Sequence, residues 1–265
     1  MSEHDRGQVA LSAAEIYDEF FVPALFADWP AKVLDAAKAR PGDRILDVAC
    51  GTGVLALAAK ELAGTDGQVV GLDVNDGMLA VARSKSAGIA WESGPAESLP
   101  YAVDSFDRVV SQFGLMFFQD RSRAIAEMLR VVRPGGNITV AVWASLGDTP
   151  GYAAVAAMLS ELFGAEIAKS IEAPYSLGDI DTLKRLFADA GAKNAVVHTV
   201  DGKARFASLD AWVYTDIKGW TLADVIDDDS FEDLRQQAPK WLSRFVQADG
   251  SVEFPAPAHI VTIAT

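Results

Sequence analysis

Short apolar runs alternate with stretches of helical periodicity through the middle of the chain, from about residue 44 to residue 143. The connections are short and carry cap and turn residues such as Asn75 and Pro134-Gly135-Gly136. This alternation predicts an α/β fold, a doubly wound parallel sheet with helices on both faces and ligands beyond the carboxyl ends of the strands. The expected strands are residues 45–48, 69–73, 89–91, 106–111 and 138–143, and the expected helices are 54–63, 75–86 and 122–132, the last stopped by Pro134-Gly135-Gly136.

The segments outside this alternating core have mainly helical patterns. Residues 12–39 predict helices that begin with a capping box of Ser12 and Glu15 and that Pro23 and Pro30 divide. Further helices are expected at 150–170, 180–190 and 208–247, and further strands at 195–200 and 259–264. The predicted division is a helical cap at 1–43, the core at 44–143, a helical insertion at 144–178, a returning core helix and strand at 179–201, a helical lid at 202–252 and a closing strand at 253–265.

Composition excludes several classes of protein. A chain of 265 residues that is 50% hydrophobic can bury one sizeable core. Its formal charge of −14, without a basic cluster, argues against nucleic acid and anionic membranes as partners. The single Cys50 excludes an internal disulfide framework. No apolar signal-peptide core follows the polar start and no run reaches the ~18 residues of a membrane span, so we expect a soluble cytoplasmic protein.

The stretch "LDVACGTGVLALAAK" carries the main chemical signal. Gly51 and Gly53 fit the G-x-G-x-x-A form of a dinucleotide-binding turn, and Asp73 lies twenty residues beyond Gly53. An acid there suits the ribose hydroxyls of a nicotinamide cofactor or of an adenosyl cofactor, so this pattern alone is weak.

Asp47, just before the glycine turn, separates these two cofactors. A pyrophosphate at the helix N-terminus would be repelled by a carboxylate a few residues away. S-adenosylmethionine carries no phosphate; it carries an ammonium and a sulfonium, which a carboxylate stabilises. The acid therefore favours S-adenosyl-L-methionine over NAD.

Four ordered segments resemble a known family. They are "RILDVACGTGVLA", "VVGLDVNDGMLAVAR", "GPAESLPYAVDSFDRVVSQFGLMFF" and "MLRVVRPGGNITVAVW". Together they make the chain similar, over about residues 12–201, to the class I S-adenosylmethionine-dependent methyltransferases, in the methyltransferase type 11 group that includes quinone C-methyltransferases. The resemblance implies a Rossmann-like, mostly parallel sheet of seven strands whose last strand, here 259–264, is antiparallel.

The resemblance also implies a set of cofactor-binding residues. It places Asp47, Gly51 and Gly53 around the methionyl part, Asp73 on the ribose and Met78 against the adenine. Pro95 stands where the family commonly has an Asp that contacts the adenine amine, which leaves Glu97 or Glu92 as substitutes. The full implied set is Tyr17, Asp47, Ala49, Gly51, Gly53, Asp73, Val74, Met78, Ala96 (through its backbone), Glu97, Gln112 and Phe113.

The remaining conspicuous residues have structural interpretations. His198 and His259 lie in expected strands without metal-ligand spacing, and we assign both to structure and expect no metal site. The acidic run at 227–229 reads as a solvated helix start that Ser230 caps. Cys50 reads as a small buried side chain, and Trp212, Tyr214 and Trp220 read as the core of the lid.

Methyl transfer from a sulfonium is an in-line displacement that needs no fixed acid–base pair for every acceptor. Glu15, Tyr17, Tyr152 and Tyr175 are possible bases, and the sequence does not rank them, so no catalytic residue is assigned. The acceptor is expected to be a small apolar or aromatic molecule, because "FGLMFF" and the lid are apolar. The alternatives are a cofactor-binding protein without methyl turnover or with other chemistry and, disfavoured by Asp47, an NAD-dependent dehydrogenase.

Overall fold

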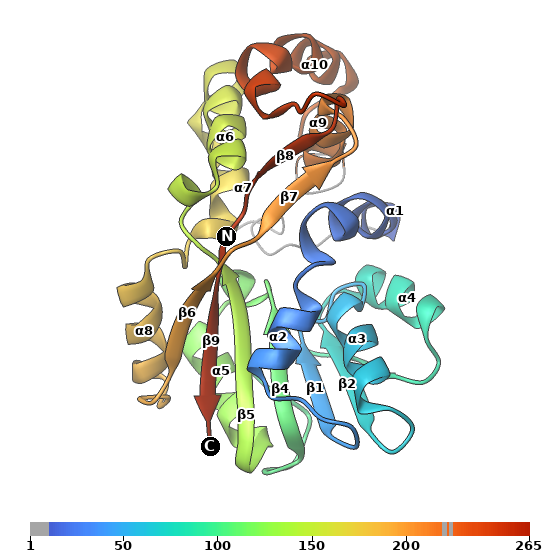
Figure 1. The fold of residues 1–265 in the computed structure, drawn as a ribbon, viewed down its shortest axis with the longest axis vertical. Coiled ribbons are helices and arrows are strands. Elements are labelled where there is room, and N and C mark those ends of the chain that lie inside the picture. Colours follow the sequence, from blue (N-terminus) through green and yellow to red (C-terminus); the bar gives the residue numbers. More distant parts are fainter. Residues whose placement is uncertain (1–10, 219–221, 223–224) are drawn as a thin grey trace.

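The computed structural model describes residues 11–218, 222 and 225–265, and within them a seven-stranded sheet forms the centre of the molecule (Figure 1). The strand order is β3-β2-β1-β4-β5-β9-β6, and the pairs from β3 through to β5 are parallel. Strand β9 runs antiparallel to both of its neighbours, which confirms the predicted reversed last strand. The strands are β1 (Arg44–Val48), β2 (Gln68–Asp73), β3 (Ala90–Ser93), β4 (Phe106–Gln112), β5 (Val132–Trp143), β6 (Val196–Val200) and β9 (Ala258–Ala264).

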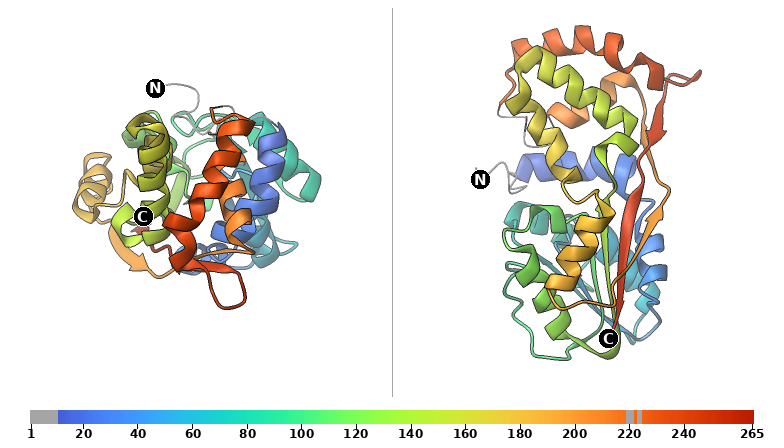
Figure 2. Two further views of the ribbon diagram at one scale, coloured as in Figure 1. Left: turned by 90° about the horizontal axis from the view of Figure 1, so that it is seen from above. Right: turned by 90° about the vertical axis from the view of Figure 1, so that its left-hand side faces the viewer.

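Helices cover both faces of this sheet, as the alternating pattern predicted. Helices α2 and α3 pack on one face and α5 and α8 on the other (Figures 1 and 2). The Asn75 side chain caps α4 by accepting from the amide of Met78 at 3.0 Å, and Asp120 caps α5 in the same way. The helices of this layer are α2 (Pro30–Ala36), α3 (Val54–Ala63), α4 (Asp76–Lys85), α5 (Arg121–Val131) and α8 (Ile180–Asp189).

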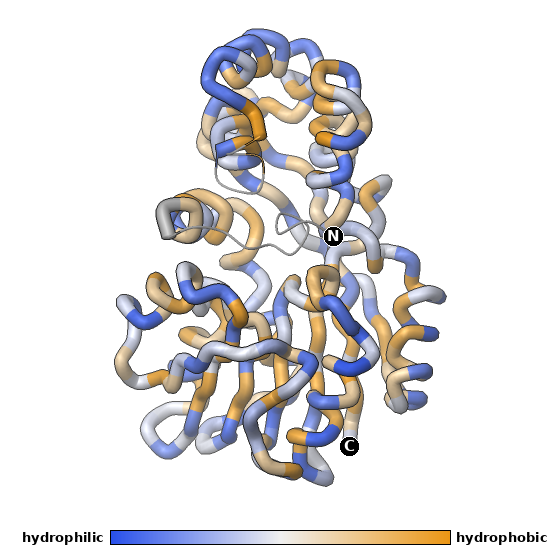
Figure 3. The backbone as a smooth tube through the Cα atoms, turned by 180° about the vertical axis from the view of Figure 1, so that it is seen from behind, coloured by the Kyte–Doolittle hydropathy of each residue, from blue (hydrophilic) through white to orange (hydrophobic). Residues whose placement is uncertain are grey.

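The core lies between these layers. The four residues 45–48 of β1 are all buried, because both faces of a parallel sheet are covered. The strands appear as apolar bands in Figure 3, whereas the outer helices carry most of the polar residues. Strand order reverses between β1 and β4, which leaves a crevice at the carboxyl ends of these two strands.

A second group of elements, the cap lobe, stands over these carboxyl ends (Figures 1 and 2). Trp212 is fully buried at its centre and packs on Phe254, with ring centroids 4.7 Å apart. The N-terminal α1 (Leu11–Ile16) and the π-helix η2 (Tyr17–Phe26) lie between the cap lobe and the sheet. The lobe contains α6 (Pro150–Phe163), α7 (Ala165–Glu172), α9 (Leu209–Lys218), α10 (Asp228–Leu242) and the antiparallel strand pair β7 (Lys203–Phe206) and β8 (Val252–Pro255).

Four local predictions were wrong. Ser12 lies inside α1, and Pro23 lies inside η2, whose wider π turn accommodates a residue that would break an α-helix. Pro134-Gly135-Gly136 lies within β5, where a register shift against β4 forms a bulge, so the helix ends at Val131 and the strand begins at once. The cap of α10 is Asp227, which accepts from the amide of Ser230, and Ser230 is inside the helix.

The antiparallel pair of β7 and β8 was not predicted. Its two strands are four residues each, and α9 and α10 lie between them in the chain. Neither strand has a long alternating pattern, so only the tertiary pairing identifies them.

Candidate functional site

Two adjoining hollows lie at the carboxyl ends of the strands. The strand-end cavity, of about 830 Å³, is lined by the ends of β1, β2 and β4 and by η2. The β3-side recess, of about 870 Å³, continues from it along the loop after β3. Most residues that were expected to bind the cofactor line the strand-end cavity: Tyr17, Asp47, Ala49, Gly51, Asp73, Val74, Met78, Gln112 and Phe113. The β3-side recess is lined by Ala96 and Glu97, and Ala49, Asp73 and Val74 of the first group line it as well.

Gly53 was also expected to bind the cofactor, but it lines neither of these two hollows. It precedes α3 with φ of 91°, and a Cβ there would come within 2.6 Å of the Trp91 ring. Gly51 has φ of 54° and open space around the position of a Cβ. The turn therefore needs glycine at position 51 for its backbone conformation, and at position 53 also for packing against Trp91.

Asp47 is an unpaired buried acid. Its side chain is 1% exposed, and neither carboxylate oxygen accepts a hydrogen bond within the described part of the chain. Burial, and next the charge of Asp73, raise its pKa well above the ordinary value, and the nearby amide of Ala56 opposes the shift without a hydrogen bond of ordinary geometry. A buried carboxylate in this state is stabilised by a cation, so the site suits a positively charged ligand group.

Asp73 shapes the loop that surrounds this acid. Its Oδ2 accepts from the amide of Gly51 at 2.8 Å, and its Oδ1 accepts from the amide of Asn75 at 2.8 Å. Burial raises its pKa, and these amides partly oppose that shift. Each carboxylate oxygen can accept a second hydrogen bond, so Asp73 can hold the turn and still bind the hydroxyls of a ligand.

The recess distinguishes between the two carboxylates considered as substitutes beside Pro95. Glu92 accepts a hydrogen bond from the Tyr101 hydroxyl at 2.9 Å and does not line the recess. Glu97 lines it, and its Oε1 accepts from the amides of Gln119 and Asp120. Glu97 is therefore the carboxylate available to a ligand there.

The N-terminal segment closes one side of the strand-end cavity. Tyr17 stacks on Phe26 with ring centroids 5.3 Å apart. Asp18, the next residue, forms an ion pair with Lys85, and Lys85 also donates to the carbonyl oxygen of Thr52 at 3.0 Å. This lysine links η2 to the glycine turn.

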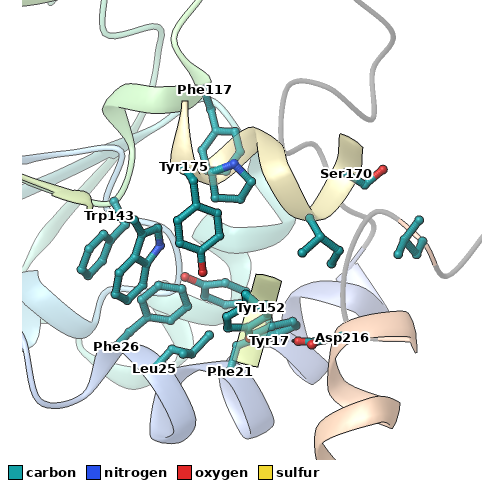
Figure 4. A pocket seen from close by; sticks show the side chains of 14 residues that line it. Tyr17, Phe21, Leu25, Phe26, Phe117, Trp143, Tyr152, Ser170, Tyr175 and Asp216 are labelled. Carbon is teal, nitrogen blue, oxygen red and sulfur yellow. Dashed lines mark hydrogen bonds between the residues drawn. The ribbon is translucent and has the colours of Figure 1, made fainter. Parts of the chain in front are cut away.

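A third hollow, the aromatic cavity, lies between the sheet and the cap lobe and measures about 650 Å³. Its walls include Trp143 and Phe113, which stack with centroids 3.8 Å apart, and Figure 4 shows the Tyr175 hydroxyl pointing into the same space. Four side chains line both this cavity and the strand-end cavity, so the two hollows share a wall. These side chains are Tyr17, Phe26, Phe113 and Phe117.

One end of the aromatic cavity is polar. The Tyr152 hydroxyl donates to Oδ1 of Asp216 at 3.0 Å. Oδ2 of Asp216 has no hydrogen-bond partner among the described residues, although the side chain is only 3% exposed. Burial raises the pKa of Asp216 to about 8. The hydrogen bond from Tyr152 opposes the shift, and so does the nearby indole of Trp212, without a hydrogen bond of ordinary geometry.

Sequence reasoning missed Asp216. The available signal was its spacing, because it follows Trp212 by four residues and so lies on the buried face of α9. An acid on an apolar helix face is rare unless it is paired or functional.

The structure places the four residues considered as possible bases at different sites. Tyr17, Tyr152 and Tyr175 line the aromatic cavity, whereas Glu15 is exposed and lines none of the three hollows. Trp220 lies outside the described residues.

The histidines and Cys50 take the following positions in the fold. His259 is buried and contacts the Thr199 hydroxyl at 2.9 Å and the Gly178 carbonyl at 3.0 Å, while His198 is exposed on β6. Cys50 is buried. Within the described chain, no group of three or more His, Cys, Asp or Glu side chains could hold a metal ion. No described helix has the length and apolar character needed to cross a membrane.

Comparison with known proteins gives a consistent result. A model of the ubiE/COQ5 methyltransferase family matches residues 15–204. The demethylmenaquinone methyltransferase of Staphylococcus epidermidis is 34% identical over 188 residues, which are 66% of this chain and 78% of that protein. The ubiquinone/menaquinone biosynthesis C-methyltransferase UbiE of Xanthomonas campestris is 38% identical over 143 residues, which are 51% of this chain and 56% of that protein.

Solved structures share the fold at lower identity. Phosphoethanolamine N-methyltransferase 2 of Haemonchus contortus, in complex with S-adenosyl-L-methionine, aligns with a TM-score of 0.62 and 18% identity over 98% of this chain and 58% of that one. The [4+2]-cyclase SpnF aligns with a TM-score of 0.54 and 20% identity over 91% of this chain and 81% of that one. At these identities the similarity concerns the fold alone.

Proposed function

Since this chain belongs to the ubiE/COQ5 methyltransferase family, and is therefore an S-adenosylmethionine-dependent methyltransferase, we propose that the strand-end cavity binds the cofactor and the aromatic cavity binds the methyl acceptor. The observation that carries this proposal is the wall that the two cavities share, with Tyr17 and Phe113 among its side chains. Because these side chains border both cavities, a cofactor in the strand-end cavity and an acceptor in the aromatic cavity would lie side by side at this border, where the methyl group can pass directly between them.

The described residues fit the cofactor chemically. Asp47, whose oxygens have no other described partner, faces the cationic methionyl end, and the open side of Gly51 lets the backbone approach it. Asp73 accepts from the ribose hydroxyls, and Met78 packs against the adenine. The backbone of Ala96 and the carboxylate of Glu97 meet the polar edge of the adenine in the β3-side recess.

The cofactor supplies a methyl group that its positive sulfur activates toward a nucleophile. The chain excludes water and aligns the acceptor, and the aromatic side chains of the shared wall serve both purposes. No metal is needed for this displacement.

The acceptor is an aromatic ring compound of the quinone class, methylated on carbon. The names of the relatives motivate this class, because they act on demethylmenaquinone or in ubiquinone and menaquinone biosynthesis. The stacked Trp143 and Phe113 present flat apolar surfaces to such a ring.

Two measurements test this function. Calorimetry should detect S-adenosylmethionine and S-adenosylhomocysteine in the micromolar range and no NAD, and Asp47→Asn should weaken S-adenosylmethionine binding at least tenfold. Asp66→Asn, a change at an exposed acid, is the matched control. Incubation with reduced naphthoquinones and benzoquinones, analysed by mass spectrometry, should give a product one methyl group heavier.

Tight NAD binding without S-adenosylmethionine binding would contradict the cofactor assignment. Cofactor binding without any methylated product would instead favour a cofactor-binding protein that uses this site for other chemistry.

A further inference from the structure

The polar end of the aromatic cavity is built by two helices of the cap lobe and by the turn that follows α7. Asp216 comes from α9, Tyr152 from α6, and Tyr175 from the short 3-10 turn Ala173–Tyr175 that follows α7. All three side chains line the cavity, and the charge of Asp216 contributes to the raised pKa values of both tyrosines. The three groups therefore form one electrostatic unit (Figure 4).

This unit exceeds what packing of the cap lobe requires. The contact between α6 and α9 needs only Oδ1 of Asp216, which accepts from Tyr152. Asp216 lines the cavity, and its buried Oδ2 has no hydrogen bond of ordinary geometry among the described residues, although the indole Nε1 of Trp212, which also has no partner among them, lies near it. An unsatisfied buried carboxylate oxygen destabilises the folded chain, and a ligand that donates a hydrogen bond removes that cost.

We propose that Oδ2 of Asp216 binds a ring hydroxyl of the acceptor and takes its proton during methyl transfer, with Tyr152 and Tyr175 as positioning residues. The proposal rests on the assignment of the aromatic cavity to the acceptor, and it assigns recognition of the ring hydroxyl of a reduced quinone to Asp216. A fully oxidised quinone has no hydroxyl to offer this oxygen.

The step balances in atoms and electrons. The hydroxyl proton moves to Asp216, and the electron pair it leaves makes the ring carbon nucleophilic. That carbon forms a bond to the methyl group while the carbon–sulfur bond breaks and its electron pair stays on sulfur. The methylated ring then regains aromaticity: the substituted carbon loses its proton to solvent, and the proton on Asp216 returns to the ring oxygen.

The chemistry of Asp216 suits this exchange. Burial raises the pKa of Asp216 to about 8, which is closer to the pKa of a phenol, near 10, than the pKa of an exposed aspartate is. Proton transfer from a phenol to Asp216 is therefore easier than transfer to an exposed aspartate. A hydrogen bond from the bound hydroxyl favours the charged carboxylate that must accept the proton.

Asp216 also lies beyond the part of the chain that matches the family, which ends at residue 204. Tyr152 and Tyr175 lie inside the matched range. Acceptor recognition in this chain therefore combines the shared sequence with its own carboxyl-terminal part.

Binding of two probes to the full chain tests the hydroxyl site. 1-Naphthol and naphthalene differ by one hydroxyl, and calorimetry is done with S-adenosylhomocysteine at saturation. We expect the wild-type chain to bind 1-naphthol at least tenfold tighter than naphthalene, and Asp216→Asn to reduce this ratio to about threefold or less. Asparagine still accepts from Tyr152 but places an amide donor where Oδ2 stood.

Control variants separate this effect from damage to the fold. Asp210→Asn makes the same change at an exposed position of α9, and Tyr214→Phe removes a partly exposed hydroxyl from the same helix. Both should keep the wild-type ratio, while Tyr152→Phe should lower it. S-adenosylhomocysteine affinity reports folding in every variant.

Equal binding of the two probes by the wild-type chain, weak binding of both, or a ratio unchanged in Asp216→Asn and Tyr152→Phe would each overturn the proposal. Failure of the wild-type chain to bind S-adenosylhomocysteine would instead contradict the proposed function itself.

Methyl transfer to 1,4-dihydroxynaphthalene tests the proton step. Asp216→Asn should lower kcat by about 10²- to 10⁴-fold with unchanged S-adenosylhomocysteine affinity, because general-base catalysis contributes on that scale. A kcat within threefold of wild type, or no wild-type turnover of this diol, would overturn the role of Asp216 as proton acceptor.

Discussion

The strand-end cavity and the aromatic cavity differ in how the chain builds them. Neighbouring residues on and after β1 and β2 form most of the first, and backbone conformation fixes its shape: Ala49, Gly51 and Gly53 all have positive φ. Segments far apart in sequence form the second, and side-chain packing fixes its shape. Each contains one buried acid without a full set of partners, Asp47 in the first and Asp216 in the second. Both cavities therefore hold an acid that a bound ligand would stabilise, but only the first cavity is formed mainly by short sequence motifs.

The largest expected effect is the pH dependence that Asp216 gives to the stability of the chain. In the unfolded chain Asp216 loses its proton near its ordinary pKa of 3.8, whereas in the folded chain it keeps it to about 8. Between these values the folded state binds more protons, so stability falls as pH rises, by about 1.4 kcal/mol per pH unit from this group. Asp216→Asn should remove this contribution, so that the variant becomes more stable than the wild-type chain as pH rises from 4, by several kcal/mol at pH 8. The contributions of Asp47 and Asp73, whose pKa values burial also raises, remain in both chains.

Urea unfolding of both chains without ligand at pH 5, 6.5 and 8 measures that slope, with Asp210→Asn as the control. Identical slopes in wild type and Asp216→Asn would mean that Asp216 ionises normally in the folded chain.

The second effect tests whether backbone conformation builds the glycine turn. Gly53→Ala should lower the free energy of unfolding by about 2 to 4 kcal/mol, because it combines a positive φ with an overlap at the Trp91 ring. Gly250→Ala has a similar φ and no neighbour within 4 Å, so its cost should be only about 1 to 2 kcal/mol. Chemical denaturation of both variants measures the difference, and equal losses would show that Trp91 yields to the added methyl.

A smaller effect is expected at Asp73. Asp73→Ala should weaken S-adenosylmethionine binding by about 1.5 to 3 kcal/mol, the range for hydrogen bonds to a charged group. It should leave the ratio of 1-naphthol to naphthalene binding unchanged, because the acceptor site lies in the other cavity. Asp76→Ala, at an exposed position three residues away, is the control for calorimetry. An unaltered cofactor affinity in a folded variant would place the ribose elsewhere.

The smallest effect concerns motion. We expect the cap lobe and η2 to exchange backbone hydrogens faster than β1 and β2, and to gain protection when S-adenosylhomocysteine binds, because covering segments must open for ligands to enter. Hydrogen exchange with mass spectrometry gives the comparison. A cap lobe as slow as β1, with no change on binding, would mean that ligands enter without movement of the lobe.

Local features account for what the sequence could predict. The expected strand at 45–48 and helix at 54–63 match β1 and α3 closely, because apolar periodicity and Gly64 define them within a short stretch. The cap at Asn75 was likewise readable from neighbouring residues. The placement of Asp47, Gly51 and Asp73 around one cavity follows from these elements.

Tertiary pairing accounts for what the sequence could not show. Strands β7 and β8 have partners about fifty residues away in the chain, and the proline in β5 is tolerated only because the strand bulges there. Asp216 accepts a hydrogen bond from Tyr152, which lies 64 residues earlier in the chain, and this contact places it at the aromatic cavity. None of these contacts leaves a periodic signal in its own segment.

The cap lobe, joined to the sheet but separate from the glycine turn, has a consequence for the evolution of substrate range. Substitutions in α6, α9 and the turn before α8 alter the aromatic cavity while β1, β2 and their loops stay unchanged. Evolution can thus change the acceptor specificity of this fold through a few substitutions in the cap lobe, while binding of the methyl donor is kept. Shared side chains such as Tyr17 and Phe113 are the exception: a substitution there alters both ligands at once, so descendants of this chain should diversify at the polar end of the cavity before they change the wall.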